Sequence, residues 1–330
     1  MNTLHAPPPQ PTAGHAVDAD RAAPRRTTGR LRRWSALHPV TAFLVIGFAL
    51  AYPVMSVPIL ASHGAIPDGW MPQTAAVDAE RMASVFGILL GLLPAALWVT
   101  WAADGAKGVR ALGRRMRRWQ IGARWWVMVV AGLPGLTLTL ALLLGDTLTP
   151  VDIGPLVAGQ VVGLLVNLLL INMWEETAWA GVVQTRLEHD HGLTKAALLT
   201  ALPFALFHMP LHFIGDYSVS SLAGALISLL IVCAIVRLMI GVFLAGTGGS
   251  ILAVAVLHTV FNRSNNDEGL VAALVEGDGR KLAGLLSVLI LTTVAAMVAR
   301  RRKTADARLM ASGSFPADVS AHHPHDKDAS

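Results

Sequence analysis

The sequence has a single cysteine and few charged residues. Cys233 is the only cysteine among 330 residues, so neither an internal disulfide nor a cysteine-based zinc site can form within one chain. Charged residues make up 14% of the chain, whereas soluble proteins contain about a quarter. This deficit argues against an ordinary soluble domain and indicates that lipid surrounds much of the protein.

Long runs of hydrophobic residues accompany the low share of charged residues. Hydrophobic residues make up 54% of the sequence, and the mean hydropathy is +0.55. The runs reach the roughly 20 residues needed to cross a hydrocarbon core of about 30 Å. Eight spans are expected, at residues 39–61, 82–103, 125–145, 156–187, 195–214, 219–244, 248–262 and 281–300. We therefore predict an all-α fold, a polytopic membrane helix bundle with about eight transmembrane helices. The fourth span is longer than a bilayer requires and the seventh is shorter, so tilt or protrusion is expected.

Positive charges cluster outside the spans, in segments that all fall on one side of the predicted membrane. They lie before the first span, between the second and third, and after the eighth, at Arg21, Arg25, Arg26, Arg30, Arg32, Arg33, Lys107, Arg110, Arg114, Arg115, Arg117, Arg118, Arg300, Arg301, Arg302 and Lys303. The loops after the first and third spans are mainly acidic. Because cytoplasmic loops are enriched in Lys and Arg, we expect a multi-pass cell-membrane protein with both termini in the cytoplasm. The net charge of +5 then reflects orientation in membrane lipid, and no nucleic-acid partner is expected.

The two ends of the chain are polar and contain no apolar run. Residues 1–35 are predicted to be a disordered basic cytoplasmic tail, and residues 304–330 a disordered C-terminal tail. The transmembrane helical domain is predicted at residues 36–303. Its unusual polar residues are concentrated between about 156 and 265.

Two adjacent glutamates, Glu175 and Glu176, lie within the long fourth span. An ionisable side chain inside a transmembrane bundle costs about 2.5–3.5 kcal/mol on insertion scales, so each one needs a reason. Adjacent helical residues point about 100° apart, and two carboxylates this close repel each other, which suits a general base or acid. The alternative is that the span ends before residue 174 and that both glutamates lie in the head-group region.

Two later spans also carry polar groups at helical spacing. Phe204 and His208 are four residues apart in the fifth span, and His258 and Asn262 are four apart in the seventh. An amide one turn from a histidine can fix the imidazole or stabilise an oxyanion. Taken singly, each pair is also explained by hydrogen bonds between helices. Together, three spans carry the residue types used in hydrolysis.

These segments resemble the motifs of the CAAX-protease and bacteriocin-processing family of intramembrane proteases, also called the Abi family. The family pattern is a double glutamate with an aromatic, an arginine and a glycine, then Phe-x-x-x-His, then His-x-x-x-Asn. The matching residues are Glu175, Glu176, Trp179, Gly181, Phe204, His208, His258 and Asn262. The resemblance covers roughly residues 160–265 and places a protease core at about 156–265. It implies hydrolysis of a peptide bond in a peptide or protein substrate, near the membrane surface.

The resemblance also implies roles for five residues. Glu175 is the expected general base on a water, and His208 helps to position or polarise that water. Glu176 is expected to buffer charge, and His258 with Asn262 to stabilise the oxyanion.

Zinc chemistry remains open beside a metal-free glutamate mechanism. His208, His258 and Glu175 are the candidate ligands of a Zn²⁺ ion, and three protein ligands would leave a position for water. Against zinc, the sequence lacks the His-Glu-x-x-His ligand pair of many zinc proteases.

One position departs from the family pattern. Ala180 stands where the family has an arginine that is thought to support the glutamates. Arg237, in the sixth span, lies near the cytoplasmic end, where its side chain is expected to extend to the membrane surface. The alternative is that Arg237 turns inward and compensates for the missing arginine.

Two other functions compete with proteolysis. The departure at Ala180 is compatible with a catalytically inactive relative that acts as a scaffold or immunity protein. A proton-coupled transporter would also use intramembrane glutamates and histidines. However, many transporters are built from internal repeats, and none is apparent here.

Overall fold

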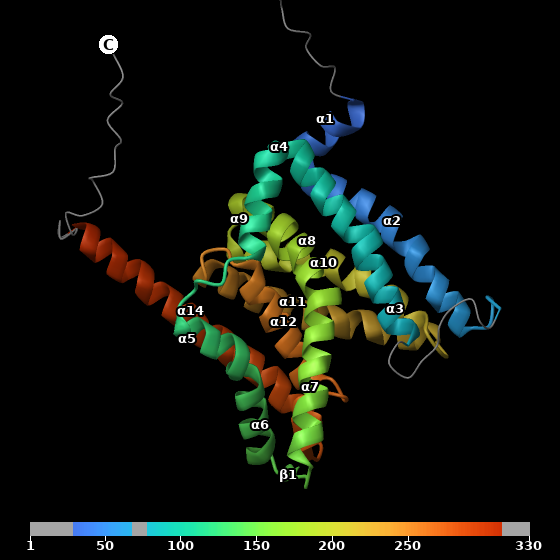
Figure 1. Ribbon diagram of the computed structural model, residues 1–330, viewed down its shortest axis with the longest axis vertical. Helices are drawn as coiled ribbons and strands as arrows, with labels where there is room; N and C mark the ends of the chain where they lie inside the picture. The colour runs from blue at the N-terminus through green and yellow to red at the C-terminus, as the bar shows by residue number, and fades with distance from the viewer. Residues whose placement is uncertain (1–28, 68–77, 312–330) are drawn as a thin grey trace, which may run out of the picture.

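Long apolar runs fold into long helices throughout residues 29–67 and 78–311, which the computed structural model describes (Figure 1). Seven helical segments of this part are long and apolar enough to cross a membrane: Pro39–Ser62, Ala79–Met116, Ala123–Leu143, Ile153–His191, Leu193–Phe213, Val219–Gly246 and Gly279–Arg301. The predicted class, a polytopic helical membrane bundle, is confirmed, and the protein is multi-pass.

Several of these segments are built from consecutive helical elements. In chain order they are α2 (Pro39–Ser62), α3 (Ala79–Phe86), η1 (Gly87–Leu92), α4 (Leu93–Met116), α5 (Ala123–Val127), η2 (Met128–Gly132), α6 (Leu133–Leu143), α7 (Ile153–Asn167), η3 (Leu168–Asn172), α8 (Met173–Ala178), η4 (Trp179–Gln184), α9 (Thr185–His191), α10 (Leu193–His208), η5 (Met209–Phe213), α11 (Val219–Gly246) and α14 (Gly279–Ala311). The elements η1 to η4 are π-helical turns and η5 is a 3₁₀ turn. Such π-helical turns are common at functional sites.

The predicted span at residues 248–262 is the helix α12 (Ile251–Asn265), which has 15 residues. At 1.5 Å per residue its length is about 22 Å, shorter than a hydrocarbon core of about 30 Å. Most of its side chains are buried, because it packs against α8, α11, η2, η3 and α6. A short central helix of this kind can carry polar side chains without exposing them to lipid.

Helices extend into both segments that were assigned to the tails. The helix α1 (Arg30–Leu37) begins inside the segment assigned to the N-terminal tail. It is held to α4 because the Trp98 indole donates a hydrogen bond to the buried Ser35 hydroxyl over 3.0 Å. At the other end α14 continues to Ala311 rather than ending at 303. Residues 1–28 and 312–330 lie outside the described part of the chain.

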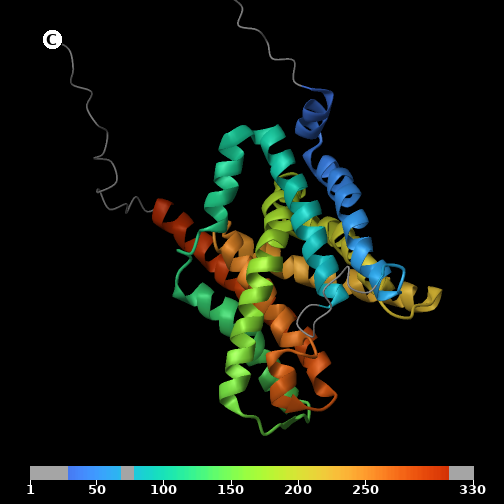
Figure 2. The same cartoon turned by 45° about the vertical axis from the view of Figure 1, so that its right-hand side comes forward.

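The basic segment after the second span is helical, whereas a loop was predicted there. Gly105 has φ +64°, a left-handed conformation that glycine adopts readily, and it bends α4 sharply. The bend is visible at the top of Figure 2, where the second half of α4 turns back toward the bundle. Near the end of this half lies Arg115, whose guanidinium donates hydrogen bonds to the carbonyls of Gly249 and Gly181 and to the Thr185 hydroxyl. These contacts stabilise the fold at the basic end of the molecule.

A small strand pair lies at the opposite end. Strands β1 (Thr147–Leu148) and β2 (Val275–Glu276) are antiparallel, with Thr147 opposite Glu276. The short helix α13 (Leu270–Leu274) precedes β2. In Figure 1, β1 is at the bottom of the molecule, and α1 and the bend in α4 are at the top. The strands therefore mark the end of the bundle opposite to the basic segments.

Candidate active site

The two glutamates lie on α8, in the interior of the bundle. The helical segment Ile153–His191 continues well past them, so no helix break separates the glutamates from the apolar run before them. Glu175 is 2% exposed and Glu176 is fully buried. Neither carboxyl can therefore be solvated by bulk water, and each depends on partners from other helices.

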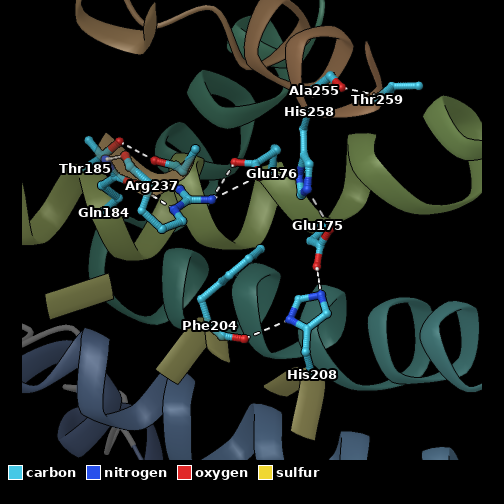
Figure 3. A network of polar contacts seen from close by, with 11 residues as sticks. Glu175, Glu176, Gln184, Thr185, Phe204, His208, Arg237, Ala255, His258 and Thr259 are labelled. Atoms are coloured by element: carbon cyan, nitrogen blue, oxygen red, sulfur yellow. Dashed lines mark hydrogen bonds and ion pairs between the residues drawn. The ribbon is translucent and has the colours of Figure 1, made fainter. Parts of the chain in front are cut away.

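Glu176 is held by an arginine and a histidine from two other helices (Figure 3). Its two carboxyl oxygens accept hydrogen bonds from Arg237 Nη1, at 2.9 and 3.0 Å. His258 Nδ1 donates to Glu176 Oε1 over 2.8 Å. The carboxylate thus joins α8 to α11 and α12. A buried charge with this many donors is compensated locally.

Arg237 is fully buried in the bundle. The expectation that its side chain extends to the membrane surface is wrong, and the alternative of an inward arginine holds. The physical reason is the buried Glu176 carboxylate, which would otherwise lack a cationic partner. The Arg237 guanidinium reaches from α11 to the glutamate, whereas the position of the family arginine is filled by the buried Ala180.

Gln184 completes the environment of Arg237, and the sequence analysis missed it. Its side-chain oxygen accepts hydrogen bonds from Arg237 Nε at 2.9 Å and Nη2 at 2.5 Å, and its Nε2 donates to the Arg237 carbonyl at 3.0 Å. Gly241 permits this close approach, because a Cβ there would lie 2.5 Å from Gln184 Nε2. An amide side chain within the apolar fourth span, about two turns after Glu176, was the sequence signal that could have revealed Gln184.

Glu175 lies between the two histidines (Figure 3). His208 Nε2 is 3.4 Å from Glu175 Oε1, and His258 Nδ1 is 3.7 Å from Glu175 Oε2. The other nitrogen of His208, Nδ1, donates to the carbonyl of Phe204 over 2.8 Å. That bond fixes the ring, because a carbonyl oxygen only accepts hydrogen bonds. In the neutral imidazole, Nε2 therefore turns a lone pair toward Glu175.

These side chains line one cavity of about 380 Å³, together with Asn262 and Asn172. The structure thus brings Glu175, His208, His258 and Asn262 to a common space, with Glu176 directly behind His258. Asn172 was not among the predicted residues. Its amide nitrogen donates to the Thr259 hydroxyl over 2.9 Å. Its side-chain oxygen and Glu175 Oε1 are both buried without a hydrogen-bond partner. Two such acceptors facing one cavity favour a bound polar molecule there.

The three candidate zinc ligands, Glu175, His208 and His258, line the same cavity. Among the residues that the structure describes, no group of three His, Cys, Asp or Glu side chains is disposed to hold a metal ion. His258 Nδ1 is engaged by Glu176, and His208 Nδ1 by Phe204. Each of these hydrogen bonds occupies one ring nitrogen of its histidine, so the other ring nitrogen is the one that can act at the cavity.

The comparison with protein families agrees with the motifs. Residues 157–264 match the family described as type II CAAX prenyl endopeptidase Rce1-like. No curated protein matches the chain. The matched range contains η3, α8, η4, α10, α11 and all but the last residue of α12, the elements that carry every residue of the site described above. The resemblance seen in the three motifs is therefore confirmed: over about a third of its 330 residues, this chain is similar to the Rce1-like CAAX prenyl endopeptidases.

Proposed function

We propose that the protein is an intramembrane endopeptidase in which Glu175 and His208 activate a water that attacks a peptide bond. The observation that carries this proposal is the convergence of four polar side chains, from α8, α10 and α12, on one cavity within the bundle. The family match adds that a CAAX-type peptidase is the expected activity. A peptide or protein is accordingly the substrate.

Glu175 serves as the general base. Its Oε1 has no hydrogen-bond partner and lies 3.4 Å from His208 Nε2. A water bound between these two atoms can donate one proton to each acceptor, which directs its oxygen toward the cavity. On attack at the carbonyl carbon, the water proton passes to Glu175, and the protonated carboxyl later donates it to the leaving amine. Asn172, whose free oxygen faces the same cavity, helps to orient the water or the substrate amide.

His258 and Asn262 stabilise the oxyanion that forms on the carbonyl oxygen. Glu176 accepts a hydrogen bond from His258 Nδ1 and fixes the ring. In the imidazolium form of His258 the other ring nitrogen, Nε2, also carries a proton, which it donates to the oxyanion. Asn262 lies one turn later on the same helix and lines the same cavity. Arg237 and Gln184 do not reach the cavity, and they act as positioning residues that hold Glu176 in place.

Asn262→Ala should lower kcat by about 10²–10³-fold, the usual effect of removing one oxyanion donor. The KM should change little, because the interaction is made mainly in the transition state. Steady-state kinetics on a purified sample would measure both constants. Asn265→Ala, one turn later on α12 and bonded to the Phe261 carbonyl, is the matched control and should retain activity. A wild-type kcat in Asn262→Ala would remove the oxyanion role.

Chelators should leave the activity unchanged. Among the described residues, no three His, Cys, Asp or Glu side chains are disposed to hold a metal ion, and a water activated by Glu175 and His208 needs no Lewis acid. Cleavage would be measured before and after dialysis against 1,10-phenanthroline, and zinc content by atomic absorption. Loss of activity that Zn²⁺ restores would replace the glutamate mechanism with a zinc mechanism.

A panel of peptides tests the function itself. Membrane-anchored and prenylated peptides, each with an unmodified counterpart, would be incubated with purified protein in lipid nanodiscs and analysed by mass spectrometry. Cleavage of any of them supports the peptidase. Its absence across the panel favours the inactive scaffold or immunity protein, and pH-driven flux in proteoliposomes would instead favour a transporter. The buried Arg237 weakens the inactive alternative, because that alternative was based on the lack of an arginine at position 180.

A further inference from the structure

The cavity has a closed end and an open end. Its deep residues include Asn172, Glu175 and His258, all of which are buried. Its outer residues are exposed: Asp78 and Glu80 at the start of α3, and Asn266, Asp267 and Glu268 directly after α12. We call these five residues the mouth. A substrate therefore reaches Glu175 past the start of α3 and the end of α12.

The mouth is at the end of the bundle opposite to the basic segments. α12 begins at Ile251, beside the Arg115 and Arg118 contacts, and ends at Asn265, beside the mouth. From the mouth, Arg280 at the start of α14 reaches back to Asp267 and to the Asn265 carbonyl. The strand pair, which lies at the bottom of Figure 1, belongs to the loops that connect helices at this same end of the bundle. Two arginines, Arg81 and Arg263, also line the cavity at this end, where they are outnumbered by the acidic residues Asp78, Glu80, Asp267 and Glu268.

From the basic end the site is closed. Between Glu176 and that end, all six residues of η4 (Trp179–Gln184) are buried. Gln184 and Arg237 bond each other, and Arg115 bonds Gly181 and Thr185. A separate cavity of about 870 Å³ does lie at the basic end, beside Arg118 and Arg300, but none of the site residues lines it. No passage to Glu175 from this side is formed by the described residues.

We propose that the active-site cavity opens to the non-cytoplasmic face of the membrane. The basic residues of α1, of the second half of α4 and of the end of α14 all lie at the closed end. By the charge rule for membrane proteins, that end faces the cytoplasm. The mouth then faces outward. The consequence for the substrate rests on the proposed peptidase activity. The scissile bond then belongs to a peptide segment that is outside the cytoplasm or in the outer leaflet. A cytoplasmic C-terminus does not reach this site.

Cysteine labelling tests the orientation without any assay of activity. Cys233 is the only cysteine and is 4% exposed, so Cys233→Ser gives a cysteine-free background. Into it would be placed Asn266→Cys at the mouth and Gln120→Cys between α4 and α5. Both positions are exposed and neutral, so neither variant alters the charge asymmetry. Glu268→Cys and Trp119→Cys form a second pair at the same two ends if the first pair folds poorly.

A membrane-impermeant maleimide should label Asn266→Cys in intact cells, and Gln120→Cys at least tenfold less until the membrane is permeabilised. Labelling after denaturation measures the total thiol in each sample. The reverse pattern, or equal labelling of both variants in intact cells, would overturn the proposal. Because this result does not depend on proteolysis, an orientation error is distinguishable from the lack of a peptidase.

The same variants test whether the substrate enters at the mouth. A bulky maleimide on Asn266→Cys should reduce peptide cleavage by purified protein more than tenfold, whereas the same label on Gln120→Cys should leave it unchanged. Inhibition through Gln120→Cys alone would show that substrates enter from the basic end and would contradict the inferred access.

Discussion

Glu175→Gln should reduce the rate of peptide cleavage by about 10²–10⁴-fold, the range that a general base contributes. Glutamine keeps the size of the side chain, but its amide cannot take the proton of the attacking water. The carboxyl oxygen concerned, Oε1, has no hydrogen-bond partner, so the substitution does not break a bond that stabilises the fold. We therefore expect kcat to fall while KM and thermal stability stay close to those of the wild type.

The design includes one control and one double variant. Glu276→Gln changes an exposed glutamate on β2 that does not line the cavity, and it should leave kcat unchanged. His208→Ala should lower kcat as well, because its Nε2 faces the same water. Since Glu175 and His208 act on one water, the double variant should be little worse than the more damaging single variant. Fully multiplicative losses would show that the two groups act separately, and full activity in Glu175→Gln would refute the assigned base.

Arg237→Ala should lower the free energy of unfolding by about 3–5 kcal/mol and abolish cleavage. Removing one member of a buried ion pair leaves the other charge without compensation, which is the reason for an effect of this size. Here Glu176 would lose both Arg237 hydrogen bonds, and the Gln184 oxygen would lose its donors. His258 would then lose its fixed partner. Arg237→Lys should restore part of the stability, because an ammonium supplies charge without the planar fork of donors.

Arg186→Ala is the matched control for this loss. Arg186 also forms an ion pair, with Asp104, but the Asp104 side chain is 51% exposed. Exposed pairs contribute about 0–1 kcal/mol, so this variant should unfold nearly as the wild type does. Chemical or thermal unfolding in lipid would measure both variants. Equal losses in Arg186→Ala and Arg237→Ala would show that burial of the Glu176 pair has no special effect.

A relocated arginine separates a positioning role from simple packing. Ala180 lies four residues after Glu176 on nearly the same helix face, so an arginine there can reach the carboxylate. Adding Ala180→Arg to Arg237→Ala should raise kcat at least tenfold above that of Arg237→Ala alone. Ala180→Leu in the same background supplies bulk without charge and should restore none. Rescue by leucine as well would mean that Arg237 fills space and does not hold the glutamate.

The sequence by itself determined the class of the protein and most of its site. Hydrophobic runs of membrane-spanning length give helices wherever they occur, because a lipid-embedded backbone must satisfy its own hydrogen bonds. The same solvent makes Glu175, Glu176 and His258 conspicuous, since polar groups are costly there. Helical spacing then paired Phe204 with His208 and His258 with Asn262. In the structure His208, His258 and Asn262 line the cavity, and the Phe204 carbonyl accepts a hydrogen bond from His208.

Only the tertiary structure decided which arginine meets the glutamates. Arg237 is 61 residues from Glu176 and 53 from Gln184, so no helical periodicity relates them, and a residue near the end of a span can equally well turn outward. Asn172 and Gln184 were missed for the same reason, because amides reveal their partners only when helices pack. The bend at Gly105 and the helix α1 depend likewise on contacts with other helices. The helical segments and the spacing of polar residues along them follow from the sequence and its lipid solvent. The direction in which a buried charged side chain points depends on the opposite charge that lies on a neighbouring helix.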